Sequence, residues 1–295
     1  MLTAIIAVTL SVPDLGTAEQ AYARWLNYRT VDQGQVSRDL AAAWGAPLAE
    51  GRRYALMQPE SGEPTYLRLV QSPPTPGYEV MKTHGWNSNE ILVEDPDKLA
   101  KMLEGSPFRM IGEPRPLSTN PEIRAMQVIG PAGELNYFTR IPAGGASVIR
   151  SSAKSFVDRT FIVVLGGASM PAMQAFYRDT LGQTVTAPVD AAIGVLQKAW
   201  GWKADVTTPL ALATISSGFV IELDEYPKEA TPRPVREGDL PPGIAIVSFA
   251  VKSLDERPLA FTVPPGPRSA APYAGRRSAM IRGAAGEWLE LIEAP

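Results

Sequence analysis

The sequence predicts an α+β protein built from four βαβββ modules. Three observations carry this prediction. Matching segments recur 155 to 156 residues apart, each half of the chain divides again, and strand-type apolar runs alternate with amphipathic helical runs. A repeat at fixed spacing is the signature of one structural unit used several times.

The first repeat links the two halves of the chain. The tripeptide that ends at Gly45 recurs in the one that ends at Gly201, a displacement of 201 − 45 = 156 residues. The glycines that open two strand-type runs, Gly62 and Gly218, are also 156 residues apart. Any single match could be chance, but a shared displacement indicates two domains of common design.

Each half then divides into two quarters. Glycine turns lead into strand-type runs at Gly62, Gly133, Gly218 and Gly286. Further strand-type runs open the quarters at residues 5–12, 89–93, 161–165 and 246–251. We expect a helix after each opening strand, most clearly at 17–26 and 170–181, and a short extra helix within 189–202. Proline-rich connectors separate the quarters at 72–77, 143–152 and 231–242.

Composition excludes several classes of function. The chain has 28 basic and 31 acidic side chains, so it lacks the positive surplus that nucleic-acid binding needs. It has no cysteine, which excludes disulfides, iron–sulfur clusters and thiol catalysis, and its single histidine excludes multi-histidine metal sites. No apolar stretch approaches the roughly 18–20 residues of a membrane span. We therefore expect a cytoplasmic protein with no nucleic-acid or membrane partner, either a monomer or a homodimer.

The repeated unit resembles the vicinal oxygen chelate superfamily, which contains glyoxalases, bleomycin-resistance proteins and ring-cleaving dioxygenases. Its pattern is His-Val-x-Leu-x-Val, then Phe-Tyr-x-x-x-Leu-Gly, then Gly-x-x-x-Glu-Leu. Similar segments here lie at 7–15 with Tyr22 and Leu26, at 162–165 with 176–177 and 181–182, and at 285–291. The resemblance covers nearly the whole chain.

The resemblance implies two tandem domains, each a cup-shaped mixed sheet with helices outside. The expected N-terminal domain is 1–142, with modules at 1–70 and 78–142. The expected C-terminal domain is 157–295, with modules at 157–227 and 242–295. Residues 143–156 would form the linker, and the two modules of each domain would close one cup.

The resemblance also implies where metal ligands would lie, on the first and last strand of each module. Those positions hold Ala7, Tyr66, Ser88, Tyr137, Ile162, Glu222, Ile246 and Glu290. First-row metal ions prefer imidazole nitrogen or several carboxylates. We therefore expect no metal and no other cofactor, with Glu222 and Glu290 as the fallback pair for a hard cation.

Strand periodicity then places side chains on the concave face of the N-terminal cup. The candidate catalytic residues are Glu90, His84 and Tyr137. The candidate substrate-binding residues are Tyr66, Arg68, Trp86, Thr9, Ser88 and Trp44. A carboxylate facing an apolar cup has a raised pKa and can act as a general base, paired phenols can stabilise an oxyanion, and an arginine can hold a carboxylate.

Each assignment has a structural alternative. His84 is equally a loop histidine, and Glu90 could be exposed on a half-solvated sheet. The two tyrosines could serve packing, Arg68 could pair only with Glu90, and Trp44 could belong to the core. Glu222 and Glu290 could be retained without a function.

Two classes of function follow from this sequence. The first is a metal-independent lyase or isomerase that acts on a small aromatic or hydrophobic acid in the N-terminal cup, by acid–base catalysis with oxyanion stabilisation. The alternative is a non-catalytic protein that binds and sequesters an aromatic metabolite or drug, as bleomycin-resistance proteins do.

Overall fold

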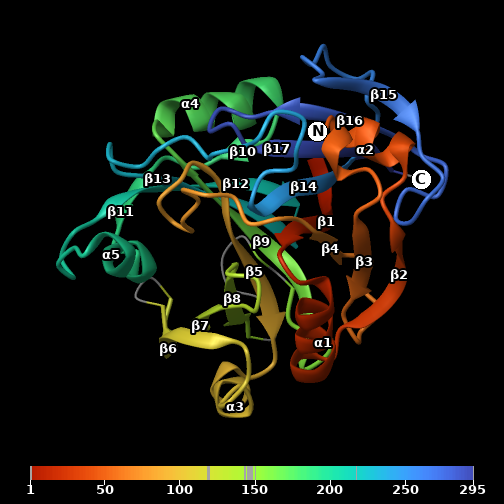
Figure 1. Ribbon diagram of the computed structural model, residues 1–295. Helices are drawn as coiled ribbons and strands as arrows, with labels where there is room; N and C mark the ends of the chain where they lie inside the picture. Colours follow the sequence, from red (N-terminus) through yellow and green to blue (C-terminus); the bar gives the residue numbers. More distant parts are fainter. Residues whose placement is uncertain are drawn as a thin grey trace.

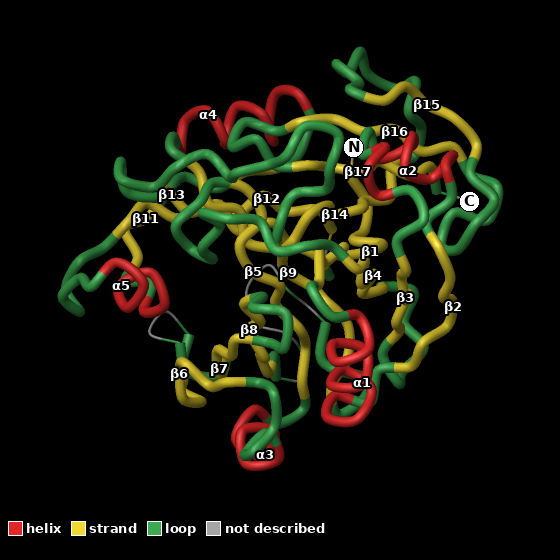
Figure 2. Tube along the Cα trace, viewed as in Figure 1, coloured by secondary structure: helices red, strands yellow, loops and turns green. Residues whose placement is uncertain are grey.

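Two mixed β-sheets with short helices around them form the protein (Figures 1 and 2). The computed structural model describes residues 2–117, 120–142, 144, 149, 151–216 and 218–294. Sheet one has eight strands in the order β15-β16-β17-β14-β1-β4-β3-β2. Sheet two has nine strands, in the order β10-β12-β13-β9-β5-β8-β7-β6, with β11 paired to β12.

The first two modules follow the predicted order of elements. Module one comprises β1 (Leu2–Val12), α1 (Leu15–Leu26), β2 (Arg29–Gln35), α2 (Arg38–Trp44), η1 (Pro47–Ala49), β3 (Arg53–Gln58) and β4 (Tyr66–Gln71). Module two comprises β5 (Gly85–Val93), α3 (Pro96–Met102), β6 (Arg109–Pro116), β7 (Arg124–Ile129) and β8 (Leu135–Arg140). In each module the first strand pairs in parallel with the last.

Modules three and four repeat this plan. Module three comprises β9 (Val157–Gly167), α4 (Met170–Ala175), the π-helix η2 (Phe176–Thr180), β10 (Thr184–Val185), β11 (Val189–Ala191), α5 (Gly194–Trp200), β12 (Thr208–Ser216) and β13 (Phe219–Glu225). Module four comprises β14 (Gly243–Val251), β15 (Val263–Pro267), β16 (Arg277–Arg282) and β17 (Trp288–Glu293). The repeat is visible in detail, since α2 and α5 both end in a tryptophan followed by a left-handed glycine, Gly45 and Gly201.

The expectation of a helix after every opening strand is wrong for module four. Residues 252–262 between β14 and β15 contain turns and bends but no helix. This segment carries a proline at position 258, which disfavours helix interiors. Leu254, Leu259 and Phe261 pack onto the core there instead.

The sharing of sheets also differs from the sequence-based expectation. Sheet one combines modules one and four, because β1 pairs antiparallel with β14. Sheet two combines modules two and three, because β5 pairs antiparallel with β9. Modules one and two therefore do not close a common cup. β1, β9 and β14 are all rich in apolar residues, and the polar residues of β5 specify no particular neighbour, so the sequence contains no local signal that selects partners. Much of the expected linker, at 143, 145–148 and 150, lies outside the described residues.

The convex faces of both sheets and the helices α1 and α4 form one large apolar core. It includes Val8 and Leu10 of β1, Ile91 of β5, and Val163 and Leu165 of β9, all buried. The alternate residues of the same strands face the concave sides, as strand periodicity predicts. None of the described helices is long and apolar enough to cross a lipid bilayer.

Candidate functional site

The concave face of sheet two carries three carboxylic acids, and we call this face the sheet-two cup. Glu90 lies on β5, where its cross-strand neighbours are Tyr137 on β8 and Ile162 on β9. Glu222 and Asp224 lie two residues apart on β13, so they share the same face. Apart from Ser88, the rest of this face is mainly apolar, with Leu92, Leu135, Val164, Val220 and Leu212.

Glu90 has the electrostatic character of a general base. Its side chain is only 8% exposed, and it accepts a hydrogen bond of 2.5 Å from Thr139 Oγ1. Burial raises the pKa of Glu90 to about 7, although the hydrogen bond from Thr139 opposes this shift. A carboxyl group with a pKa near neutrality can take up and release protons at physiological pH.

The two acids on β13 are shifted in the same direction. Burial raises the pKa of Asp224 to about 8. Burial, together with the neighbouring Asp224 and Glu90, raises the pKa of Glu222 well above its usual range. Asp224 is 2% exposed, and its Oδ1 atom has no hydrogen-bond partner among the described residues. An unpartnered buried polar atom is uncommon and marks a position where a further group can bind.

Tyr137 lies within the field of all three acids. Burial raises its pKa well above the usual value, and the charges of Glu222, Asp224 and Glu90 add to that shift. The phenol therefore stays protonated and can donate a hydrogen bond. A proton acceptor and several proton donors thus face one apolar concavity, the combination that acid–base catalysis requires.

The helix α5 covers one end of the sheet-two cup, and Figure 1 shows it at the periphery of the molecule. Val195 and Leu196 of α5 pack in one cluster with Leu135 and the half-buried Tyr137. Trp200 donates a hydrogen bond of 3.1 Å to the carbonyl of Met81, and the ammonium group of Lys198 donates to the carbonyl of Ile111. These two hydrogen bonds hold α5 against β6 and the segment that contains Met81.

The concave face of sheet one holds a buried ion pair instead. Arg68 Nη1 lies 3.6 Å from Glu290 Oε2, and the two side chains are 2% and 0% exposed. Glu290 also accepts hydrogen bonds from Ser248 Oγ at 2.6 Å and Tyr273 OH at 2.7 Å. Thr9 Oγ1 accepts a 3.4 Å hydrogen bond from Arg68. The carboxylate is thus saturated by protein donors.

Aromatic side chains fill the rest of this concave face. Trp44 at the end of α2 is fully buried and donates to the Tyr273 hydroxyl at 3.1 Å. The Arg68 guanidinium lies over both rings, 5.1 Å from Trp44 and 5.4 Å from Tyr273. Trp44 therefore belongs to the core rather than to a substrate wall, and the sheet-one cup is filled by its own chain.

The expected constellation is thus divided between the two sheets. Glu90, Tyr137 and Ser88 do share one concave face. Arg68, Tyr66, Thr9 and Trp44 belong to the other sheet, so the expectation that they join Glu90 is wrong. The cause is the pairing of the modules. Strand parity predicts which side chains face the concave side of a sheet, but not which modules share that sheet, and here module one pairs with module four and module two with module three.

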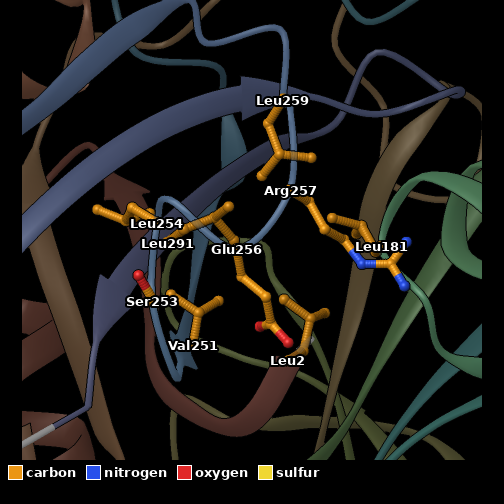
Figure 3. Close-up of a pocket in the computed structure, with 9 residues that line it drawn as sticks. All are labelled: Leu2, Leu181, Val251, Ser253, Leu254, Glu256, Arg257, Leu259 and Leu291. Carbon is orange, nitrogen blue, oxygen red and sulfur yellow. The ribbon is translucent and has the colours of Figure 1, made fainter.

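His84 and Trp86 lie in neither cup. Both line a separate pocket of about 110 Å³ where β5 meets the ends of β14 and β17. Trp86 has the same even parity as Glu90, but the register of β5 against β9 shifts between Trp86 and Ser88, and Trp86 packs in the large apolar core with Ile91. The expectation that Trp86 lines the cup beside Glu90 is therefore wrong. Another hollow, beside Leu2 and Leu181, is walled mainly by leucines (Figure 3) and holds about 10 Å³, no more than one water molecule.

No family model and no curated protein matches this sequence. Solved structures match along almost the whole chain. Glyoxalase I from Zea mays superimposes with a TM-score of 0.63 at 14% identity, covering 98% of this chain and 92% of that one. A proposed dioxygenase from Bacillus subtilis gives 0.63 at 14% identity, with 100% and 86% covered.

The chain has the vicinal oxygen chelate fold. This confirms the resemblance that the repeated motifs indicated. An identity of 14% shows the fold alone, because one fold serves many unrelated reactions.

The residues at the ligand positions of the vicinal oxygen chelate fold do not fit a metal ion. The sheet-two cup offers Ser88, Tyr137, Ile162 and Glu222 there, and the sheet-one cup offers Ala7, Tyr66, Ile246 and Glu290. The described residues contain no group of three or more histidine, aspartate or glutamate side chains that could hold a metal. The fallback pair is wrong as well, because Glu222 and Glu290 lie in different sheets and Glu290 is bound to Arg68.

The sequence did not predict that Glu222 and Asp224 lie on the same face as Glu90. Both acids fall within the expected C-terminal domain, away from Glu90. Glu222 was predicted only as a metal ligand, and Asp224 was not among the predicted site residues. Strand periodicity alone places Glu222 and Asp224 on one face of β13. The pairing of β13 with β9, and of β9 with β5, brings that face beside Glu90.

Proposed function

We propose that this protein is an acid–base lyase or isomerase that acts without a metal ion on a small aromatic or hydrophobic compound in the sheet-two cup. The observation that supports it is the set of raised pKa values on one apolar face, about 7 for Glu90 and about 8 for Asp224. Catalytic acids and bases are most efficient when their pKa lies near the working pH.

The pKa values assign different roles to the three acids. Near neutral pH a large fraction of Glu90 is ionised, so it is the base that removes a proton from a substrate carbon. Asp224 and Glu222 remain largely protonated, so either can return a proton at a second position or to a leaving group. Tyr137 donates a hydrogen bond to the oxygen on which negative charge develops. Return of the proton gives isomerisation, and loss of a leaving group gives elimination.

The charge of the substrate is revised by the structure. A carboxylic acid was expected because Arg68 could clamp it, but Arg68 is tied to Glu290 in the other sheet. A substrate carboxylate in the sheet-two cup would face the partly ionised Glu90, which among the described residues has no lysine or arginine partner to offset its charge. We therefore propose an uncharged or cationic substrate with an apolar body. Cytoplasmic location and a monomeric or homodimeric state remain predictions.

The test is proton exchange in heavy water. Uncharged aromatic compounds that carry an acidic carbon–hydrogen bond are incubated with the protein in D2O, and NMR follows deuterium incorporation and product formation. Glu90→Gln should lower the rate by about 10²–10⁴, the usual cost of removing a positioned base. Its matched control is Glu134→Gln, since Glu134 is equally buried but lies outside the cup and accepts a hydrogen bond from Tyr22.

The control should keep its rate within a few fold. If Glu90→Gln exchanges deuterium as fast as the unmodified protein, the sheet-two cup does not act through this base and the proposal fails.

A second function is favoured by one observation. Among the described residues, Glu90, Glu222 and Asp224 form no ion pair with lysine or arginine. An acidic, partly aromatic cup suits a cationic aromatic compound, which it would sequester rather than convert. A cationic aromatic ligand that quenches tryptophan fluorescence, gives no new product and exchanges no deuterium would support this function over catalysis.

A further inference from the structure

The pocket between the two sheets is lined by an arginine, Arg233, that has no carboxylate partner among the described residues. It is lined by His84, Gly85, Trp86, Pro232, Arg233, Val235, Pro241, Ile244, Ala245, Ala285, Gly286, Glu287 and Trp288. It lies outside both cups, because Trp86 faces away from Glu90 on β5. Nothing in the acid–base function described above uses it.

Arg233 is held in place by backbone carbonyl groups and by the Tyr78 ring, whose centroid lies 5.2 Å from its guanidinium carbon. Its Nη2 atom donates to Trp86 O at 2.6 Å, and Nη1 donates to Ile244 O at 2.9 Å and Pro242 O at 3.3 Å. Among the described residues it makes no ion pair, and its Nε atom is buried without a hydrogen-bond partner. A buried charge that lacks both a counter-ion and a full set of hydrogen bonds is costly.

A second nitrogen atom without a partner belongs to His84, in the same pocket wall. The Nε2 atom of His84 is buried and has no hydrogen-bond partner in the described part of the chain. Arg233 lies close enough to His84 that its charge, after burial, contributes to lowering the histidine pKa. Two nitrogen atoms without a protein partner, Arg233 Nε and His84 Nε2, therefore belong to residues that line one hollow.

The acid in the wall does not neutralise Arg233. Glu287 is turned away, accepting a 2.9 Å hydrogen bond from Tyr177 OH and a 2.8 Å hydrogen bond from the Ala285 amide. Burial raises the pKa of Glu287, so its negative charge is also reduced. The remaining wall is apolar and partly aromatic, with Trp86 and Trp288 joined by a 2.9 Å hydrogen bond from the Trp86 indole to the Trp288 carbonyl.

We propose that this pocket binds a small aromatic carboxylate, with the carboxylate at Arg233 and His84 and the ring against the tryptophans and prolines. The carboxylate supplies the missing counter-ion, and arginine suits a planar carboxylate. The volume of about 110 Å³ limits the ligand to one ring at most, since a cavity of about 150 Å³ accommodates benzene.

Calorimetric titration of the full-length protein with benzoate tests the site. We expect a Kd of a few millimolar or tighter, and at least about tenfold weaker binding of the uncharged isostere benzamide and of acetate, which lacks the ring. Arg233→Met should abolish benzoate binding. If Arg233→Met does not fold, Val235→Trp replaces it, because Val235 is 39% exposed at the pocket wall and a larger side chain there closes the pocket.

Glu90→Gln separates this site from the sheet-two cup and should leave benzoate binding unchanged. Benzoate binding that survives Arg233→Met or Val235→Trp, equals that of benzamide or acetate, or is lost in Glu90→Gln overturns the proposal. So does the absence of any heat of binding up to about 10 mM benzoate. None of these outcomes depends on whether the sheet-two cup is catalytic.

Discussion

Arg68 and Glu290 form a buried ion pair that joins the first module to the last. Their closest atoms are 3.6 Å apart, and each side chain is at most 2% exposed. Arg68 extends from β4 and Glu290 from β17, which are separated by β1 and β14 in sheet one. The pair therefore spans the joint between two modules that lie at opposite ends of the sequence.

Removing one member of this pair should destabilise the fold strongly. Arg68→Met leaves the Glu290 carboxylate buried without its cation, which typically costs about 3–5 kcal/mol. Urea denaturation measures the loss, and the double variant Arg68→Met with Glu290→Gln should recover part of it. The surface pair of Arg38 and Glu50 is the control, since Arg38→Met should cost at most about 1 kcal/mol. An equal loss in both single variants would contradict a structural role for the buried pair.

The stability of the protein should fall as the pH rises from 5 to 8. The folded-state pKa of Glu90 is raised from 4.5 to about 7, so folding favours its protonated form. This stabilisation is complete below the unfolded pKa and is lost as pH rises through about 7. Its upper size is roughly 3 kcal/mol, since one pKa unit corresponds to about 1.4 kcal/mol. Denaturant midpoints at several pH values measure it, and Glu90→Gln should reduce the dependence, leaving the part that Asp224 and Glu222 contribute.

Catalysis should have a bell-shaped pH profile. Glu90 must lose its proton to act as a base, so the rate rises through about pH 7. Asp224 must keep its proton to act as an acid, so the rate falls through about pH 8. Asp224→Asn should remove or displace the alkaline limb and leave the acidic limb in place. Loss of the acidic limb in that variant would show that the two roles are assigned the wrong way round.

The local opening of α5 should be limited by its two hydrogen bonds, from Lys198 to Ile111 and from Trp200 to Met81. Lys198→Met removes the hydrogen bond to Ile111, worth about 1 kcal/mol, so amide hydrogen exchange within residues 194–200 should quicken about fivefold. Mass spectrometry of exchanged peptides measures this rate. Lys228→Met is the control, because Lys228 is exposed outside α5. Unchanged exchange in both variants would mean that the apolar contacts of Val195 and Leu196 hold the helix alone.

The sequence predicted the local structure well because its signals are local. Strand parity correctly placed Thr9, Arg68, Glu90 and Tyr137 on concave faces, but the expectation that all four share one cup is wrong, because β1 and β4 belong to sheet one and β5 and β8 to sheet two. The choice of partner between modules could not be derived, because β1, β9 and β14 are alike in their apolar content and the polar residues of β5 specify no particular neighbour. For the same reason the sequence could not show that Trp44 and Tyr273 fill one cup while the acids of the other lack counter-ions.

The pairing of the first module with the last sets the order in which the protein can fold during synthesis. Strand β1 ends at Val12, whereas its neighbour β14 begins at Gly243, a separation of 243 − 12 = 231 residues. At about 5–20 residues per second, the ribosome adds this stretch in roughly 10–50 s. During that interval β1 presents an unpaired edge, while β5 and β9 can already have joined. The nascent chain therefore carries an open half-sheet, and until its final strands emerge the free edge of β1 is a site where another chain can pair.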